Sequence, residues 1–269
     1  MAREKKPQHP VSLGSACRGD TALALLPQMR AAPAGPTELA VVASMVTDAD
    51  PLAGAVLRLG IDGHIAAHRG NDASYWEPRD ERARARLGDL LGPLPAGCEA
   101  CQDYPAPRRD PNVLLPATPL RGPDDLTLAA EWLLHPQARV GMTVSHARLL
   151  SLALATLAEN ALLHSESDQS PTACAALDPL ARSLEIAVVD AGPALGEGEQ
   201  AEQVLRELIG SSRRVGGGLA SLMAIAERRG IEASLLLASG PGRVRIRQQA
   251  SYATRVHFPG FAGAFSIHL

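Results

Sequence analysis

The chain contains few aromatic residues and almost no lysine. Phe, Trp and Tyr make up 3% of the 269 residues, while apolar residues make up 46%, so a core must be built mainly from leucine, alanine and valine. Lysine occurs only at positions 5 and 6, and all other strongly basic side chains are arginines. The net charge of −3 lacks the basic excess typical of nucleic-acid-binding proteins. We expect no nucleic-acid partner.

Long apolar runs are missing as well. No uninterrupted apolar stretch approaches the roughly 20 residues that a membrane-spanning helix needs. The polar first ten residues are not followed by the apolar core of a signal peptide. The sequence therefore predicts a cytoplasmic protein that makes no use of a membrane.

Cysteine is too scarce for a disulfide framework in a chain of this length. The four cysteines are at positions 17, 98, 101 and 174. Cys98 and Cys101 have the spacing of metal ligands, and His64 and His68 could complete a four-ligand site. Structural zinc sites usually contain two such cysteine pairs. We favour ordinary thiols in a turn over a zinc site.

The first third of the chain carries no motif that indicates a chemical activity. Residues 1–36 mix proline, glycine and charge without periodicity, which predicts a flexible leader. Residues 37–92 predict a small α+β domain of unknown role. A stretch rich in breakers, residues 93–111, is the predicted linker.

Local patterns give elements for this small N-terminal domain. Residues 38–46 favour a strand or a short buried helix. Residues 55–68 favour two strands joined by a hairpin turn at Asp62-Gly63. Residues 79–91 have helical spacing with a charged, solvated face.

After the linker the periodicity is clearer. Predicted strands cover residues 111–118, 184–190, 233–239, 243–248 and 252–258, and predicted helices cover residues 124–134, 145–164, 197–209 and 219–229. Ser145 is the expected N-cap of the longest helix. This order favours a two-layer α/β sandwich over residues 112–260, with helices on one face of a mixed sheet, followed by a tail at 261–269.

The longest helix is apolar nearly all round, so its polar residues need an explanation. Thr156, Asn160 and His164 recur every four residues and form one stripe. They either bond to a neighbouring strand, mark a solvent-facing edge, or line a site. Arg243, Arg245 and Arg247 alternate on one predicted strand face, which we expect to be exposed to solvent.

Downstream residues favour a site for a nucleotide. Asp190, at a strand end, can accept a hydrogen bond from an exocyclic amine, and Gly192 lets the backbone approach a flat ring. The helix that begins near Leu219 is preceded by residues suited to phosphates: Arg213, Arg214, Gly216, Gly217 and Gly218. The side-chain oxygen of Asn160 can bind Mg²⁺. Individually, the glycines could be a hinge and Asp190 an ordinary turn residue.

These motifs resemble those of the GHKL ATPases, which have the Bergerat fold, and most closely the anti-sigma-factor serine kinase branch. Asn160–His164 resembles the N box, Asp190–Ala194 the first glycine box and Gly216–Ala220 the second, over residues 112–260. The resemblance implies that ATP and Mg²⁺ are cofactors. It also implies a protein partner of the signalling or sigma-factor-regulator type, and it allows a homodimer.

By the same resemblance, several residues have expected roles. Asn160 would hold Mg²⁺, Asp190 would bind the adenine amine, and Thr254 would support the Asp190 end of the pocket. Residues 195–215 would form a mobile lid. Transfer of the γ-phosphoryl group of ATP to a partner protein or to water is the activity that the resemblance implies.

The sequence departs from the family pattern where catalysis would occur. Thr156 stands where the family has a catalytic Glu, and a hydroxyl is not a general base at neutral pH. Glu159 lies about 100° round the helix from Asn160 and is a weak alternative. Ala194 and Ala220 replace usual glycines. The alternative function is thus a catalytically impaired nucleotide-binding module that acts through protein interaction.

Overall fold

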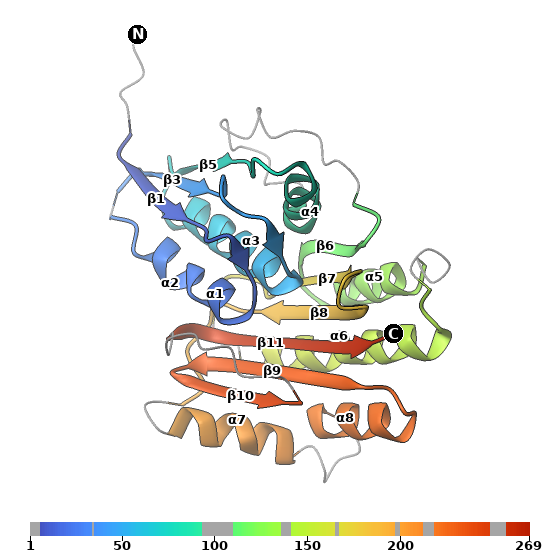
Figure 1. Cartoon of the computed structure of the whole chain (residues 1–269). Coiled ribbons are helices and arrows are strands. Elements are labelled where there is room, and N and C mark those ends of the chain that lie inside the picture. The colour runs from blue at the N-terminus through green and yellow to red at the C-terminus, as the bar shows by residue number, and fades with distance from the viewer. Residues whose placement is uncertain are drawn as a thin grey trace.

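The computed structural model describes residues 6–33, 35–92, 110–135, 141–164, 167–196, 200–211, 218–247 and 257–269. Its largest sheet has six strands in the order β10-β9-β11-β8-β7-β6, and every neighbouring pair is antiparallel (Figure 1). The strands are β6 (Val113–Pro119), β7 (Thr172–Asp178), β8 (Ser183–Val189), β9 (Ala233–Gly240), β10 (Gly242–Ile246) and β11 (Phe258–His268).

Helices from the same part of the chain cover one face of this sheet. They are α5 (Pro123–Leu134), α6 (Val144–His164), α7 (Gln200–Ser211) and α8 (Leu219–Arg228). Figure 1 shows α6 behind the strands and α7 and α8 along the β10 edge. Leu157 of α6, Leu222 of α8 and Ile186 of β8 are fully buried in the core between the two layers.

The N-terminal unit, residues 6–92, has a parallel three-stranded sheet in the order β1-β3-β5. Its strands are β1 (Gln8–Ser12), β2 (Ala16–Cys17), β3 (Glu38–Val42), β4 (Asp48–Ala49) and β5 (Asp72–Trp76), and its helices are α1 (Gly19–Leu23), α2 (Leu25–Arg30), α3 (Pro51–Ala67) and α4 (Glu81–Leu91). Strands β2 and β4 form a separate parallel pair. Helix α3 packs against β7 and β8, so the N-terminal unit covers the second face of the large sheet.

The predicted α/β class is confirmed, because the chain combines helices with parallel and antiparallel sheets. The large sheet itself is antiparallel and not mixed. Within it, β6, β8, β9, β10 and all four helices lie close to their predicted positions. Strand β7 was not predicted, and residues 252–256 of the last predicted strand lie outside the described residues.

The predicted hairpin at residues 55–68 is wrong, because these residues belong to helix α3. Asp50 caps the helix by accepting a hydrogen bond from the Ala53 amide at 2.8 Å, and Pro51 occupies the first turn. Asp62 is not in a turn but pairs with Arg58 one helical turn earlier, at 2.8 Å. Burial of α3 on most sides therefore outweighs the local turn signal.

Both predicted ends of the chain also need correction. Residues 6–33 of the expected leader form β1, β2, α1 and α2, and Leu23 and Leu26 are buried in the core. Residues 261–269 of the expected tail include most of β11, which pairs with both β8 and β9. The N-cap of α6 is Thr143 instead of Ser145, since its Oγ1 accepts the His146 amide at 3.2 Å.

None of the described helices is long and apolar enough to cross a membrane. Within the same ranges, no group of three or more His, Cys, Asp and Glu side chains is arranged to hold a metal ion. Cys98 and Cys101 lie outside the described residues, so the zinc site that their spacing would allow is not tested.

Candidate nucleotide site

The best-defined part of the candidate site is the residue that follows β8. Asp190 is 1% exposed, and its backbone amide donates to the Phe261 carbonyl at 2.9 Å. Its Oδ1 accepts a hydrogen bond from the Gly192 amide at 2.7 Å. The side chain is therefore held in one orientation by its own turn and by the neighbouring strand.

Gly260 is a site residue that the sequence analysis missed. Its φ is +117°, and a Cβ built on it would lie 2.4 Å from the Asp190 carbonyl oxygen. Only glycine satisfies both conditions without moving the backbone. No local motif marks this contact, because Gly260 and Asp190 belong to segments that are far apart in the sequence.

The second oxygen of Asp190 is buried and unpaired. Among the described residues, none donates a hydrogen bond to Oδ2. Burial raises the pKa of this carboxyl to about 6, although the hydrogen bonds from Gly192 and Phe261 and the charge of Arg30 act in the opposite direction. A buried acceptor without a donor is costly, so this atom is suited to a donor supplied by a ligand.

The N-terminal unit reaches this strand end through Arg30. The Arg30 Nη2 donates to the carbonyl of Ala191 at 2.8 Å, and its charge acts on the Asp190 carboxyl. Residues 30 and 191 are 161 positions apart, which is why no local pattern links them. Arg30 thus connects α2 to the turn after β8.

On α6, the predicted polar stripe is only partly available to a ligand. Thr156 is 5% exposed, and its carbonyl accepts a hydrogen bond from the Asn160 Nδ2 at 2.7 Å. This bond leaves the Asn160 Oδ1 as an acceptor on a half-buried side chain. Glu159 is exposed, and it is the only carboxylate on this helix. The side chain of His164 lies outside the described residues.

The topology brings Asn160 and Asp190 to the same end of the sheet. Helix α6 ends at residue 164, and β7 begins at Thr172, opposite Val189. The C-terminal half of α6 therefore lies at the end where β8 leads into Asp190. Helix α6 packs closely on the sheet here: Leu157 lies directly over Gly263 of β11, where a Cβ would come within 2.5 Å of the Leu157 Cδ2.

Helix α8 points its N-terminus toward this end as well. Its C-terminus leads into β9, which starts near Ile267 and finishes opposite Phe258, next to Asp190 (Figure 1). Gly218 is the N-cap with a φ of +95°, and Leu219 is fully buried. The structure thus brings Asp190, Gly192, Asn160 and Gly218 toward one end of the sheet.

Several predicted site residues cannot be placed. Arg213, Arg214, Gly216, Gly217 and Thr254 lie outside the described residues. Of the predicted lid, residues 200–211 form α7, and Ala201 and Leu205 are fully buried. A Cβ on Gly242 of β10 would lie 2.7 Å from the Ala201 carbonyl carbon, so the start of this helix packs tightly against β10.

The expectation that Arg243, Arg245 and Arg247 are exposed is wrong for the first two. The Arg243 and Arg245 side chains are 13% and 19% exposed, and both pair with Asp20 of α1. Arg247 is 45% exposed and pairs with Glu227 at 3.1 Å. Arg243 and Arg245 hold the N-terminal unit against the sheet.

Comparisons of the chain with family models, with curated proteins and with solved structures find no match. The function is therefore inferred from the site residues. Asp190 offers a buried acceptor, and Asn160 offers one uncharged oxygen to a cation. Such a site fits Mg²⁺ bound chiefly through the phosphates of a nucleotide, because Mg²⁺ commonly uses one or two protein ligands.

Proposed function

We propose that residues 110–269 bind an adenine nucleotide together with Mg²⁺, and that the large sheet with α6 and α8 is a variant of the Bergerat sandwich. The observation that carries the proposal is the unpaired, buried Oδ2 of Asp190, which is suited to the exocyclic amine of adenine. Two further features support it: Asn160 lies at the same end of the sheet and suits Mg²⁺, and α8 points its N-terminus toward that end, as a phosphate site requires.

Asp190 predicts base selectivity that calorimetry can measure. Adenine presents an amine to the carboxylate, whereas hypoxanthine presents a carbonyl oxygen at the same position, and two acceptors repel. We expect MgADP to bind at least about tenfold more tightly than MgIDP, since a charge-assisted hydrogen bond contributes roughly 1.5 to 3 kcal/mol. Equal affinity for the two nucleotides would contradict the assignment of Asp190 as the acceptor of the adenine amine.

The Asp190→Asn variant sharpens this experiment. The new amide can turn its NH₂ toward the carbonyl of hypoxanthine, so MgADP should bind roughly 10- to 100-fold more weakly and the preference over MgIDP should shrink. Asp168→Asn is the matched control, because Asp168 is an exposed carboxylate. A loss of affinity in both variants would indicate a general charge effect instead of base recognition.

The structure favours slow turnover over efficient phosphoryl transfer. Thr156 carries no charge, and Glu159 is exposed. We infer a cytoplasmic regulatory protein that signals to a protein partner through its nucleotide state. The resemblance to anti-sigma kinases supports this partner class.

Restoring a carboxylate tests the inference about catalysis. Thr156→Glu should raise ATP turnover, because a positioned general base typically contributes about 10²- to 10⁴-fold. Thr156→Gln is the matched control for side-chain size, and circular dichroism checks the fold of both variants. Fast turnover by the wild-type protein that is lost in Glu159→Gln would contradict the assignment.

A further inference from the structure

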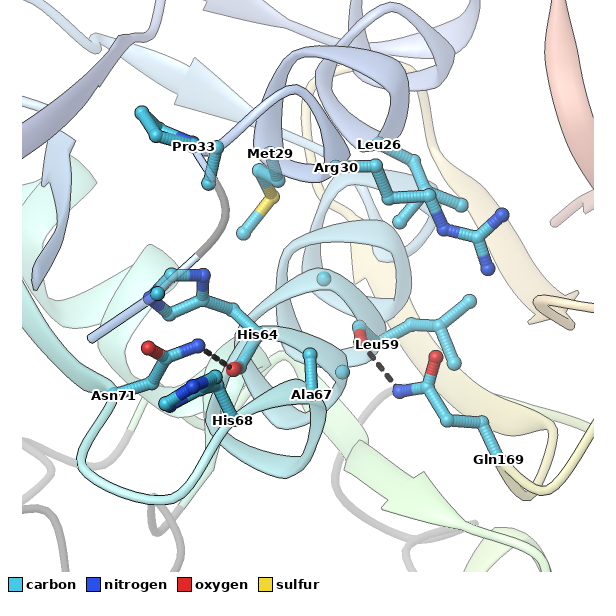
Figure 2. A pocket seen from close by; sticks show the side chains of 14 residues that line it. Leu26, Met29, Arg30, Pro33, Leu59, His64, Ala67, His68, Asn71 and Gln169 are labelled. Atoms are coloured by element: carbon cyan, nitrogen blue, oxygen red, sulfur yellow. Dashed lines mark hydrogen bonds between the residues drawn. The ribbon is translucent and has the colours of Figure 1, made fainter. Parts of the chain in front are cut away.

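A cavity lies in the N-terminal unit, on the side of α3 that faces α2. Its volume is about 370 Å³, within the range of pockets that bind small molecules. Figure 2 shows Arg30 and Gln169 on one side of the cavity and His64, His68 and Asn71 on the other, with Met29 between them. None of these side chains has a role in the proposed nucleotide site except Arg30, which borders both.

The floor of the cavity is the backbone of α3. Gly60 and Gly63 both face it, and a Cβ at these positions would lie 2.4 Å from the Met29 Sδ and 2.7 Å from the Gln169 amide. The absence of side chains lets Met29 and Gln169 pack directly on the helix. Leu26, Met29 and Leu59 lie behind this surface and are only 1–2% exposed. The apolar wall that a ligand can contact is formed by Ala32, Pro33 and Ala67, which are half-buried or exposed.

Among the described residues that line the cavity, Arg30 is the only one with a permanent charge, and burial lowers the pKa of His64, which favours its neutral form. The lining residues within the described part of the chain include one arginine and two histidines but no Asp or Glu. The far end is rigid, because Asn71 donates to the His64 carbonyl at 2.6 Å and accepts from the Thr37 amide at 3.0 Å. Such a lining favours an anion over a cation.

Arg30 is the group best suited to bind this anion. Its Nη2 donates to Ala191, and the other guanidinium N–H groups have no acceptor among the described residues. A guanidinium binds a carboxylate through two parallel hydrogen bonds, which fixes the orientation of the ligand. The opposing charge of Asp190 lies on the strand-end side and does not line the cavity.

We propose that this cavity binds a small organic carboxylate, with its carboxylate on Arg30 and an apolar body against Ala32, Pro33 and Ala67. The apolar wall distinguishes this ligand class from inorganic phosphate, which would leave the wall uncovered. The proposal does not rest on the nucleotide site, because Arg30 is the only described residue that borders both.

The test is a titration of the full-length protein with benzoate, 4-hydroxybenzoate and adipate, each alongside its neutral amide. Calorimetry should give saturable binding of at least one acid, with a Kd of about 1 mM or lower, and at least tenfold weaker binding of the matching amide. Arg30→Gln should weaken binding of that acid by about tenfold or more. No nucleotide is present, so the outcome is independent of the nucleotide site.

A matched pair of variants on α3 separates binding in the cavity from binding elsewhere. Ala67 lines the rim and is exposed, so Ala67→Phe should block the cavity without disturbing the core. Ala66 is exposed and does not line it, so Ala66→Phe should bind like the wild type. The proposal is overturned if no acid binds at about 10 mM, if acids and amides bind equally, or if Ala67→Phe retains wild-type affinity.

Discussion

The two faces of the six-stranded sheet are closed by different kinds of contact. The face under α6 and α8 presents large apolar side chains, such as Ile186, Leu237 and Phe265. The face under the N-terminal unit presents mainly alanines, and its margins carry ion pairs such as that of Asp20 with Arg245. Large apolar contacts supply most of the stability of a core, whereas ion pairs contribute little net energy. We infer that the helical face holds the fold and that the N-terminal face is the adjustable one.

The largest loss of stability is expected from a substitution on the face that packs under α6 and α8. Phe265→Ala removes a fully buried aromatic side chain from β11 and should lower the free energy of unfolding by roughly 3 to 5 kcal/mol. Ala264→Gly, one residue earlier on the opposite face, should cost about 1 kcal/mol. Urea unfolding at pH 7.5 measures both, and equal losses would contradict the difference between the faces.

A smaller effect is expected from the ion pairs of the N-terminal face. Asp20→Asn leaves Arg243 and Arg245 without their carboxylate and should cost about 2 kcal/mol, because these side chains are still partly hydrated. The deficit should shrink at high salt, which screens the repulsion between the two arginines. Asp168→Asn serves as the exposed control. A loss as large as that of Phe265→Ala would show that the ion pairs hold the fold equally.

A substitution at Asp190, which follows β8 at the end of the sheet, should raise the stability of the protein instead of lowering it. Asp190→Asn removes a buried charge and should raise the stability of the nucleotide-free protein at pH 7.5 by about 1 kcal/mol. The folded pKa of about 6 lies above the unfolded value of 3.8, so the folded state binds the proton more tightly. The wild type should therefore lose stability relative to the variant as the pH rises from about 4 to about 6. Thermal unfolding across this range checks the sign.

The smallest effect concerns Arg30, which joins the two parts, and it rests on both proposals. A carboxylate on Arg30 would offset the positive charge beside Asp190 and favour the protonated carboxyl. Saturating acid should then weaken MgADP binding by a few-fold, within the usual range of coupling energies. The Ala67→Phe variant should show no such effect. Tighter MgADP binding in the presence of the acid would contradict this direction.

Local patterns were enough to predict most of the C-terminal elements. Asp190, Gly192 and Asn160 could be selected from the sequence because each lies in, or just after, a regular strand or helix whose periodicity is clear. The hairpin at residues 55–68 failed because Asp62-Gly63 is a strong local turn signal, while burial of α3 on several sides is a property of the whole fold.

Contacts between distant segments could not be predicted. Arg30 reaches Ala191, Gly260 packs on Asp190, and Arg243 and Arg245 pair with Asp20, yet no spacing rule relates these positions. The alternation of the arginines predicts a solvated strand face, and it gives no sign that Asp20 of α1 packs against two of them. Their role depends on tertiary packing, which the local period cannot encode.

The most direct test of the account is the pH dependence of MgADP affinity in the wild type and in Asp190→Asn. If the ionised carboxylate accepts the adenine amine, the wild type should lose up to about tenfold in affinity per pH unit below about 6, because binding then requires loss of a proton. Protonation of the nucleotide phosphates affects the affinity of both proteins equally, so it cancels in the ratio of the two affinities. We predict that the advantage of the wild type over the variant is constant above about pH 7 and shrinks steadily toward pH 5. An advantage that stays unchanged across this range, or no advantage at all, would contradict the role of Asp190.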